Sequence, residues 1–172
     1  FDIINLVLYK TKFNHYFKFI YCQGMIALAA SIVLSCYGMY NAKNTVITTY
    51  NVEIDKDFND KSLMVISDIH LGTIVSKTDL TKISNHAGTI DPDAIILLGD
   101  IFDENTPLDD MLNACKVLSR ISNKQGIYYI YGNHDNGSHA FKDIAFTPED
   151  IRKNLEFNGI EVLDDEIVTL EN

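Results

Sequence analysis

Residues 94–103 read Ala-Ile-Ile-Leu-Leu-Gly-Asp-Ile-Phe-Asp, an aliphatic run of five residues that ends on a glycine and an aspartate. Such a run is typical of a strand buried on both faces of a parallel sheet. Two further β-type runs stand on either side of it, Leu63–Ser67 and Ile127–Tyr131, and polar residues follow each of them. The three runs predict three strands of one sheet.

Helical patterns separate these strands. Helix starts are predicted at Ser76–Asp79, Thr106–Pro107 and Thr147–Asp150, where a capping residue or a proline precedes an amphipathic stretch. Further strands are expected at Ile160–Leu163 and Ile167–Leu170. Strands that alternate with helices in this way predict an α/β fold of βαβαβ type with a mostly parallel sheet.

The amino-terminal part of the chain has a different composition. No charged residue stands between Lys18 and Lys43, and we expect a transmembrane helix at residues 19–42. About 22 residues of helix span roughly 33 Å, enough for a hydrocarbon core of about 30 Å. A cleaved signal peptide and a buried soluble helix are the alternatives, and a small-residue cleavage site at the end of the run is missing. Residues 1–18 resemble the end of an earlier transmembrane helix followed by a basic loop.

Charge divides the chain in the same place. Residues 1–43 carry four lysines and one aspartate, whereas residues 44–172 carry 10 basic and 23 acidic side chains. We therefore expect a juxtamembrane connection at 43–61, with a weakly alternating stretch at Val46–Val52, and a globular domain at 62–172. The positive-inside rule places the acidic domain on the extracytoplasmic side. An acidic domain is a poor partner for nucleic acid, so no nucleic acid is expected.

Polar motifs follow the three central strands. They are Asp68-Ile69-His70, Gly99-Asp100-Ile101-Phe102-Asp103 and Gly132-Asn133-His134-Asp135. The carboxyl ends of parallel strands share one rim, so motifs far apart in sequence meet there. Each residue alone is also common as a strand-end cap or in a turn. Together, their oxygen and nitrogen donors favour divalent Mn, Fe, Zn, Ni or Co.

These blocks resemble a known superfamily. Residues 67–72 (Ser-Asp-Ile-His-Leu-Gly), 98–103 (Leu-Gly-Asp-Ile-Phe-Asp) and 131–135 (Tyr-Gly-Asn-His-Asp) are similar to the first three signature blocks of the calcineurin-like metallophosphoesterases. The apolar head further resembles the bacterial membrane-anchored branch. The resemblance covers residues 62–172 and implies one half of a metallophosphoesterase-type sandwich.

The resemblance also implies a site with two divalent metal ions. Asp68 and His70 would bind the first metal, Asp100 would bridge both, and Asn133 would bind the second. A metal-bridging hydroxide would attack the phosphate ester. The superfamily pattern adds a later histidine and a Gly-His-x-His block, which are not present up to Asn172. We therefore expect an amino-terminal fragment that binds metal weakly and is weakly active or inactive alone.

The catalytic residues implied are His134 and Asp135. His134 would contact the phosphoryl oxygen and protonate the leaving group, Asp135 would orient His134, and Asp103 would support a ligand from behind. The expected activity is hydrolysis of phosphomonoesters, phosphodiesters or pyrophosphates, and the membrane tether favours lipid-linked or cell-envelope substrates. A DNA exonuclease of the same superfamily and a non-catalytic scaffold are the alternatives.

Overall fold

The computed structural model describes residues 24–42, 44–54, 60–136 and 145–171, and the chain divides into two units at residues 47 and 48. Residues 1–18, expected to hold an earlier helix end and a basic loop, lie outside the described residues, as do residues 19–23 of the expected span.

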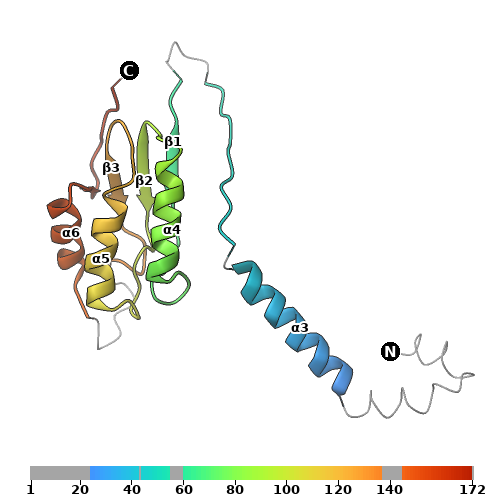
Figure 1. Ribbon diagram of the computed structural model, residues 1–172. Helices are drawn as coiled ribbons and strands as arrows, with labels where there is room; N and C mark the ends of the chain where they lie inside the picture. The colour runs from blue at the N-terminus through green and yellow to red at the C-terminus, as the bar shows by residue number, and fades with distance from the viewer. Residues whose placement is uncertain (1–23, 43, 55–59, 137–144, 172) are drawn as a thin grey trace, which may run out of the picture. The chain divides into compact units, whose positions relative to one another are not determined.

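The first unit contains helix α3, Met25–Ala42 (Figure 1). Its 18 residues include no charged side chain, so it is long and apolar enough to cross a membrane by length and composition. An 18-residue helix is about 27 Å long. The hydroxyl of Ser31 donates to the carbonyl of Ala27, which satisfies a polar group within the apolar helix.

The second unit is built on a parallel sheet of four strands. The strands are β1 (Leu63–Ile66), β2 (Ala94–Leu98), β3 (Ile127–Ile130) and β4 (Glu161–Leu163), and they lie side by side in sequence order. Every neighbouring pair is parallel. The carboxyl ends of all four strands therefore face the same rim.

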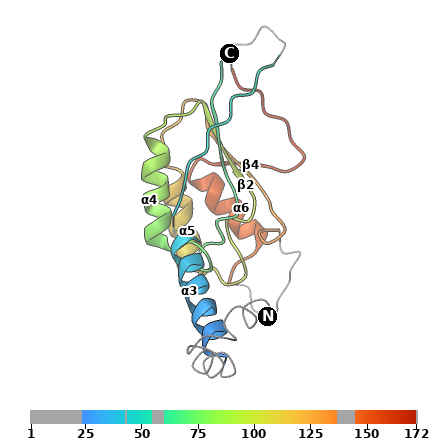
Figure 2. The same cartoon turned by 90° about the vertical axis from the view of Figure 1, so that its right-hand side faces the viewer.

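Three helices connect the strands and pack on the sheet (Figures 1 and 2). They are α4 (Lys77–Gly88), α5 (Leu108–Leu118) and α6 (Pro148–Phe157). Ser76 caps α4 through the amide of Asp79, and Thr147 and Asp150 form a reciprocal capping box on α6. The predicted helix starts are thus confirmed at all three places.

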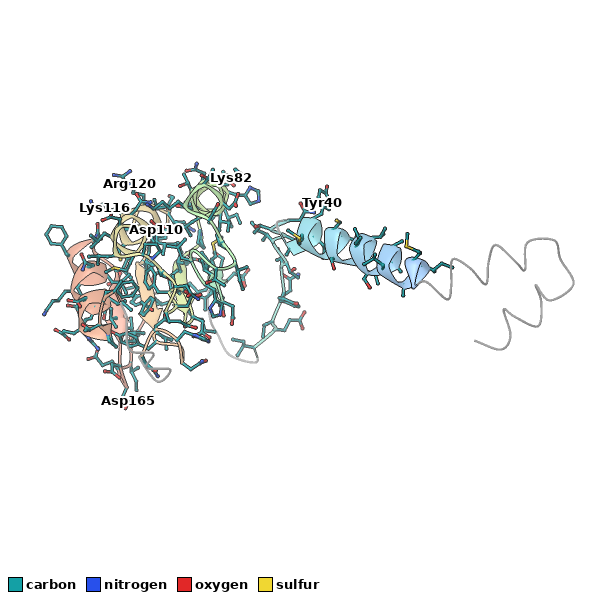
Figure 3. The ribbon with its side chains drawn as sticks, turned by 90° about the horizontal axis from the view of Figure 1, so that it is seen from below. Tyr40, Lys82, Asp110, Lys116, Arg120 and Asp165 are labelled. Carbon is teal, nitrogen blue, oxygen red and sulfur yellow. The ribbon has the colours of Figure 1, made fainter. Side chains whose placement is uncertain are left out.

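The sheet has one covered and one open face. The covered face packs against apolar side chains of the helices. The buried residues of this core include Ile95, Leu97, Ile127 and Tyr129 on the strands and Leu80, Met111, Cys115, Ile151 and Leu155 on the helices. The charged side chains of Lys82 on α4, Lys116 on α5 and Arg120, just after α5, lie on the outer side of the helices (Figure 3). On the open face, Leu63, Val65 and Leu98 remain about half exposed, at 52%, 54% and 47%.

Asp93 connects the strands at the opposite edge of the sheet, where their amino-terminal ends lie. Its carboxylate accepts hydrogen bonds from the amide and hydroxyl of Ser62 at 2.8 and 2.9 Å, and Lys124 donates to it at 3.1 Å. The Ser62 amide is the largest cause of its low pKa, and with Lys124 it lowers the pKa of Asp93 from 3.8 to about 2. These contacts join the segments that lead into β1, β2 and β3.

The predicted α/β fold with a parallel sheet is confirmed. The strand expected at Ile160–Leu163 is seen as β4, Glu161–Leu163, whereas Ile167–Leu170 is not a strand, and Ile167 is 95% exposed. Val46–Val52 is extended but pairs with no strand among the described residues. A strand requires a hydrogen-bonding neighbour, which an alternating sequence alone cannot supply.

Candidate metal centre

The segments after β1 and β2 continue to pair beyond the strands. The amides of Asp68 and His70 donate to the carbonyls of Gly99 and Asp100 at 3.2 and 3.0 Å, and the amide of Leu71 donates to the carbonyl of Ile101. This extended ladder holds the first two motifs next to each other at the rim. The sheet therefore positions the polar residues through backbone contacts.

Two glycines allow the motifs at 99–103 and 132–135 to come into contact. A Cβ on Gly132 would lie 2.1 Å from Oδ1 of Asp100, and a Cβ on Gly99 would lie 2.7 Å from Cα of Gly132. Gly99 also has a positive φ of 71°, a conformation that glycine adopts without steric cost. The close approach of these loops thus requires glycine at both positions.

Three of the predicted metal ligands adopt the left-handed backbone conformation. Asp68, His70 and Asp100 have φ values of 55°, 43° and 52°. For residues other than glycine this conformation costs about 1–2 kcal/mol each. Such strain gathers where the fold holds side chains in an orientation that a relaxed backbone would not provide.

His70, Asp100 and His134 form a group that could hold a metal ion. One donor atom of each residue lies within 4.8 Å of the other two, and all three side chains are half-buried. The two imidazole rings meet edge to face with their centroids 4.8 Å apart. These donors come from the ends of three different strands, so only the folded sheet assembles them.

A carboxylate lies behind each of these histidines. Asp103 Oδ2 is 3.4 Å from Nδ1 of His70, and Glu104 Oε2 is 3.0 Å from Nδ1 of His134. The hydrogen bond with Glu104 is the largest cause of a raised pKa at His134, and the charges of Asp100 and Glu104 raise it further. A carboxylate that accepts a hydrogen bond from one ring nitrogen fixes the orientation of the ring and of its other nitrogen. Metal-bound histidines are commonly oriented by such a carboxylate.

Asp135 connects the third motif to the second. Its buried carboxylate accepts hydrogen bonds from the amides of Phe102 at 2.8 Å and Gly132 at 3.1 Å. Burial raises the pKa of Asp135, while these two amides act in the opposite direction. In addition, the amide of His134 donates to Oδ1 of Asp100 at 3.0 Å. The loop that carries His134 is thereby held against the loop that carries Asp100.

The remaining predicted ligands, Asp68 and Asn133, follow β1 and β3 at the same rim. Asp68 is exposed, and its carboxylate accepts a hydrogen bond from the hydroxyl of Ser67. Asn133 is exposed between Gly132 and His134. The metal roles of Asp68, His70, Asp100 and Asn133 stay predictions, as do the catalytic roles of His134 and Asp135.

Sequence reasoning missed Glu104. The residue directly follows the block Leu98–Asp103, and an acidic side chain next to a predicted metal motif is a signal that could have been noticed. Its contact with His134 depends on the turn at residues 104–105, which brings the side chain back over the rim.

The residues present fit a divalent metal ion. Imidazole nitrogen and carboxylate oxygen are the donors that borderline divalent cations prefer, and both histidines have a carboxylate near Nδ1. His70 and Asp100 would hold the ion, with Asp68 and Asn133 as neighbouring candidates. The group therefore supports the binding of a divalent metal ion at this rim.

Known proteins resemble this chain over the same region. A transmembrane protein with a metallophosphoesterase domain from Danio rerio is 29% identical over 117 residues, 66% of this chain and 26% of the relative. A protein of the same description from Bos taurus is 28% identical over 114 residues, 64% of this chain and 25% of the relative. An uncharacterized metallophosphoesterase from Campylobacter jejuni is 29% identical over 109 residues, 60% of this chain and 29% of the relative.

The chain thus spans about a quarter of the length of these relatives. A family model for the calcineurin-like phosphoesterase domain matches residues 61–170, which include the whole parallel sheet and all three motifs. On this match, which takes in well over half of its residues, the chain belongs to the calcineurin-like phosphoesterase family.

Proposed function

We propose that this chain carries part of the active site of a membrane-anchored phosphoesterase that depends on two divalent metal ions. The observation that supports it most directly is the meeting of His70, Asp100 and His134 at one rim. Family membership supports the reaction class, a metal-dependent hydrolysis of phosphate esters. Because the chain spans about a quarter of its relatives, the activity of the whole protein is a proposal.

Each residue at the rim has a proposed task. Asp68 and His70 would help to hold one metal ion, Asn133 would help to hold the other, and Asp100 would serve both ions. When bound, the ions supply positive charge to the phosphoryl oxygens and lower the pKa of water. We propose that the remaining ligands come from a further part of the domain.

His134 is proposed to act on the substrate. Its ring lies beside that of His70, so Nε2 can reach an ester oxygen near the metal ligands. There it hydrogen-bonds the phosphoryl oxygen and gives a proton to the departing alkoxide. Asp135 contributes by holding the loop of His134 against Phe102.

Helix α3 supports membrane association, as do relatives described as transmembrane proteins. We propose that the domain at 62–172 lies on the extracytoplasmic side, since the lysines cluster before the helix. A location at the membrane favours lipid-linked or other cell-envelope phosphate esters as substrates.

Hydrolysis of bis(p-nitrophenyl) phosphate by the full-length protein tests the proposal. Asp100→Asn is expected to lower the rate by about 100-fold or more, and a chelator should do the same until Mn²⁺ is returned. Asp91→Asn is a matched control, because Asp91 shares the positive φ, at 49°, and lies at the other end of β2. Equal rates for Asp100→Asn and wild type would contradict the assignment.

The same preparation distinguishes the alternatives. Metal-dependent degradation of duplex DNA in preference to small esters would favour an exonuclease. A protein that binds divalent metal but hydrolyses neither substrate would favour a non-catalytic scaffold.

A further inference from the structure

Two consecutive acidic residues, Asp103 and Glu104, contact two different histidines of the rim. Asp103 faces Nδ1 of His70 at 3.4 Å, and Glu104 faces Nδ1 of His134 at 3.0 Å. The two rings are in edge-to-face contact. A single short segment after β2 therefore contacts both imidazoles from behind.

Both carboxylate oxygens of Asp103 already have partners. It is only 6% exposed, and its Oδ1 accepts hydrogen bonds from the amide of Asn105 at 2.9 Å and the hydroxyl of Thr106 at 3.2 Å. Its other oxygen faces His70. These contacts anchor Asp103 on the side of His70.

Asp135 is engaged in a similar way. One carboxylate oxygen accepts from the amide of Phe102 and the other from the amide of Gly132. Glu104 differs from both of these acids because it is half-buried and its carboxylate reaches the ring of His134 directly.

We infer that Glu104 is the positioning residue of His134: its carboxylate accepts a hydrogen bond from Nδ1–H and leaves Nε2 directed at the substrate. An ionised carboxylate has no proton to give, so Nδ1 must be the donor. In the neutral ring this contact favours the Nδ1–H tautomer, and in the protonated ring it leaves the Nε2–H proton available to the leaving group. In both forms the contact restrains rotation of the side chain. Its consequence for catalysis rests on the proposed role of His134 in hydrolysis.

The ring itself provides a test that does not require activity. In the chain labelled with ¹⁵N-histidine, the ring nitrogens of His134 should show the Nδ1–H tautomer at a pH where the ring is neutral. Glu104→Ala should shift the ring toward the Nε2–H tautomer, which free imidazole side chains prefer, and Glu104→Gln should retain Nδ1–H because its amide oxygen still accepts. An unchanged tautomer in Glu104→Ala would overturn the inference.

Kinetics of the full-length protein provide the second test. Glu104→Ala should lower kcat by about 10–100-fold with little change in KM, because ring orientation matters most as the leaving group departs. The loss should be larger for an alkyl phosphate than for a p-nitrophenyl ester, whose leaving group needs less protonation. Glu104→Gln should recover most of kcat.

Glu149→Gln is the matched control. Glu149 is an exposed carboxylate on α6 that pairs with Lys153, so its substitution should leave both the tautomer and kcat unchanged. Wild-type protein without hydrolase activity would refute the proposed function, and the ring spectrum would still decide the role of Glu104. Full kcat in Glu104→Ala, alongside an inactive Asp100→Asn, would overturn the inference and leave the function in place.

Discussion

Among the glycines that the structure describes, Gly132 leaves the least room for an added methyl group, so Gly132→Ala should disrupt the rim. The new Cβ would lie 2.1 Å from Oδ1 of Asp100 and 2.4 Å from its amide nitrogen, whereas ordinary contacts begin near 3.4 Å. Rotation of the Asp100 side chain could relieve the first clash. The second involves backbone, so the two loops must move apart by about 1 Å.

The expected cost follows from that displacement. Overpacking of this kind destabilises folded proteins by about 1–3 kcal/mol. A misplacement of about 1 Å at a reacting centre lowers rates by about 100-fold. We therefore expect Gly132→Ala to lower the free energy of unfolding by about 2–3 kcal/mol, measured by urea denaturation, and to lower phosphodiester hydrolysis by about 100-fold.

Gly88→Ala provides the comparison. Its Cβ would meet the amide nitrogen of Ser122 at 3.6 Å, an ordinary contact near the end of α4. Alanine is favoured over glycine in helices by about 1 kcal/mol, so this variant should be as stable as wild type or slightly more stable. If Gly132→Ala matched Gly88→Ala in both stability and activity, the close approach of the two loops would be refuted.

Three further predictions concern stability and metal binding. Asp93→Asn should destabilise the domain above pH 4, because the pKa of Asp93 is about 2 in the folded protein against an ordinary 3.8. The difference in stability from wild type should fade as the pH falls from about 4 to about 2. A pH series of denaturation midpoints measures this difference, and a difference that stays constant with pH would contradict the prediction. Thr147→Ala should cost about 1 kcal/mol in urea denaturation through loss of the α6 capping box, and no change would argue against the cap. Calorimetric titration of this chain with Mn²⁺ should detect no pair of tight sites, and two tight sites would contradict the expectation of missing ligands.

The fold was predictable because its signals are local. Continuous aliphatic runs marked β1 to β3, and capping residues marked the helix starts, including Ser76 and Thr147. Val46–Val52 and Ile167–Leu170 have strand-like patterns but no strand neighbour in the described parts of the chain. Pairing depends on residues elsewhere, which a local pattern cannot show.

The site was predictable only in part. The motifs indicated a common rim, and the structure places His70, Asp100 and His134 together there. The partner of the His134 ring was not predictable, because a short turn determines where Glu104 points. Residues at strand ends follow from topology, whereas contacts made by turn residues depend on individual backbone angles.

The order of the strands bears on how the domain is synthesised. Strands β1, β2, β3 and β4 occupy the sheet in the order in which the ribosome produces them. Each new strand can add to the edge formed by the strand before it. No pair of strands that has already formed has to open. Domains form from the amino terminus as the chain emerges, so this sheet can grow by one strand at a time from β1. The loop after β3, which carries His134, then joins His70 and Asp100 only when the third strand has paired with the second.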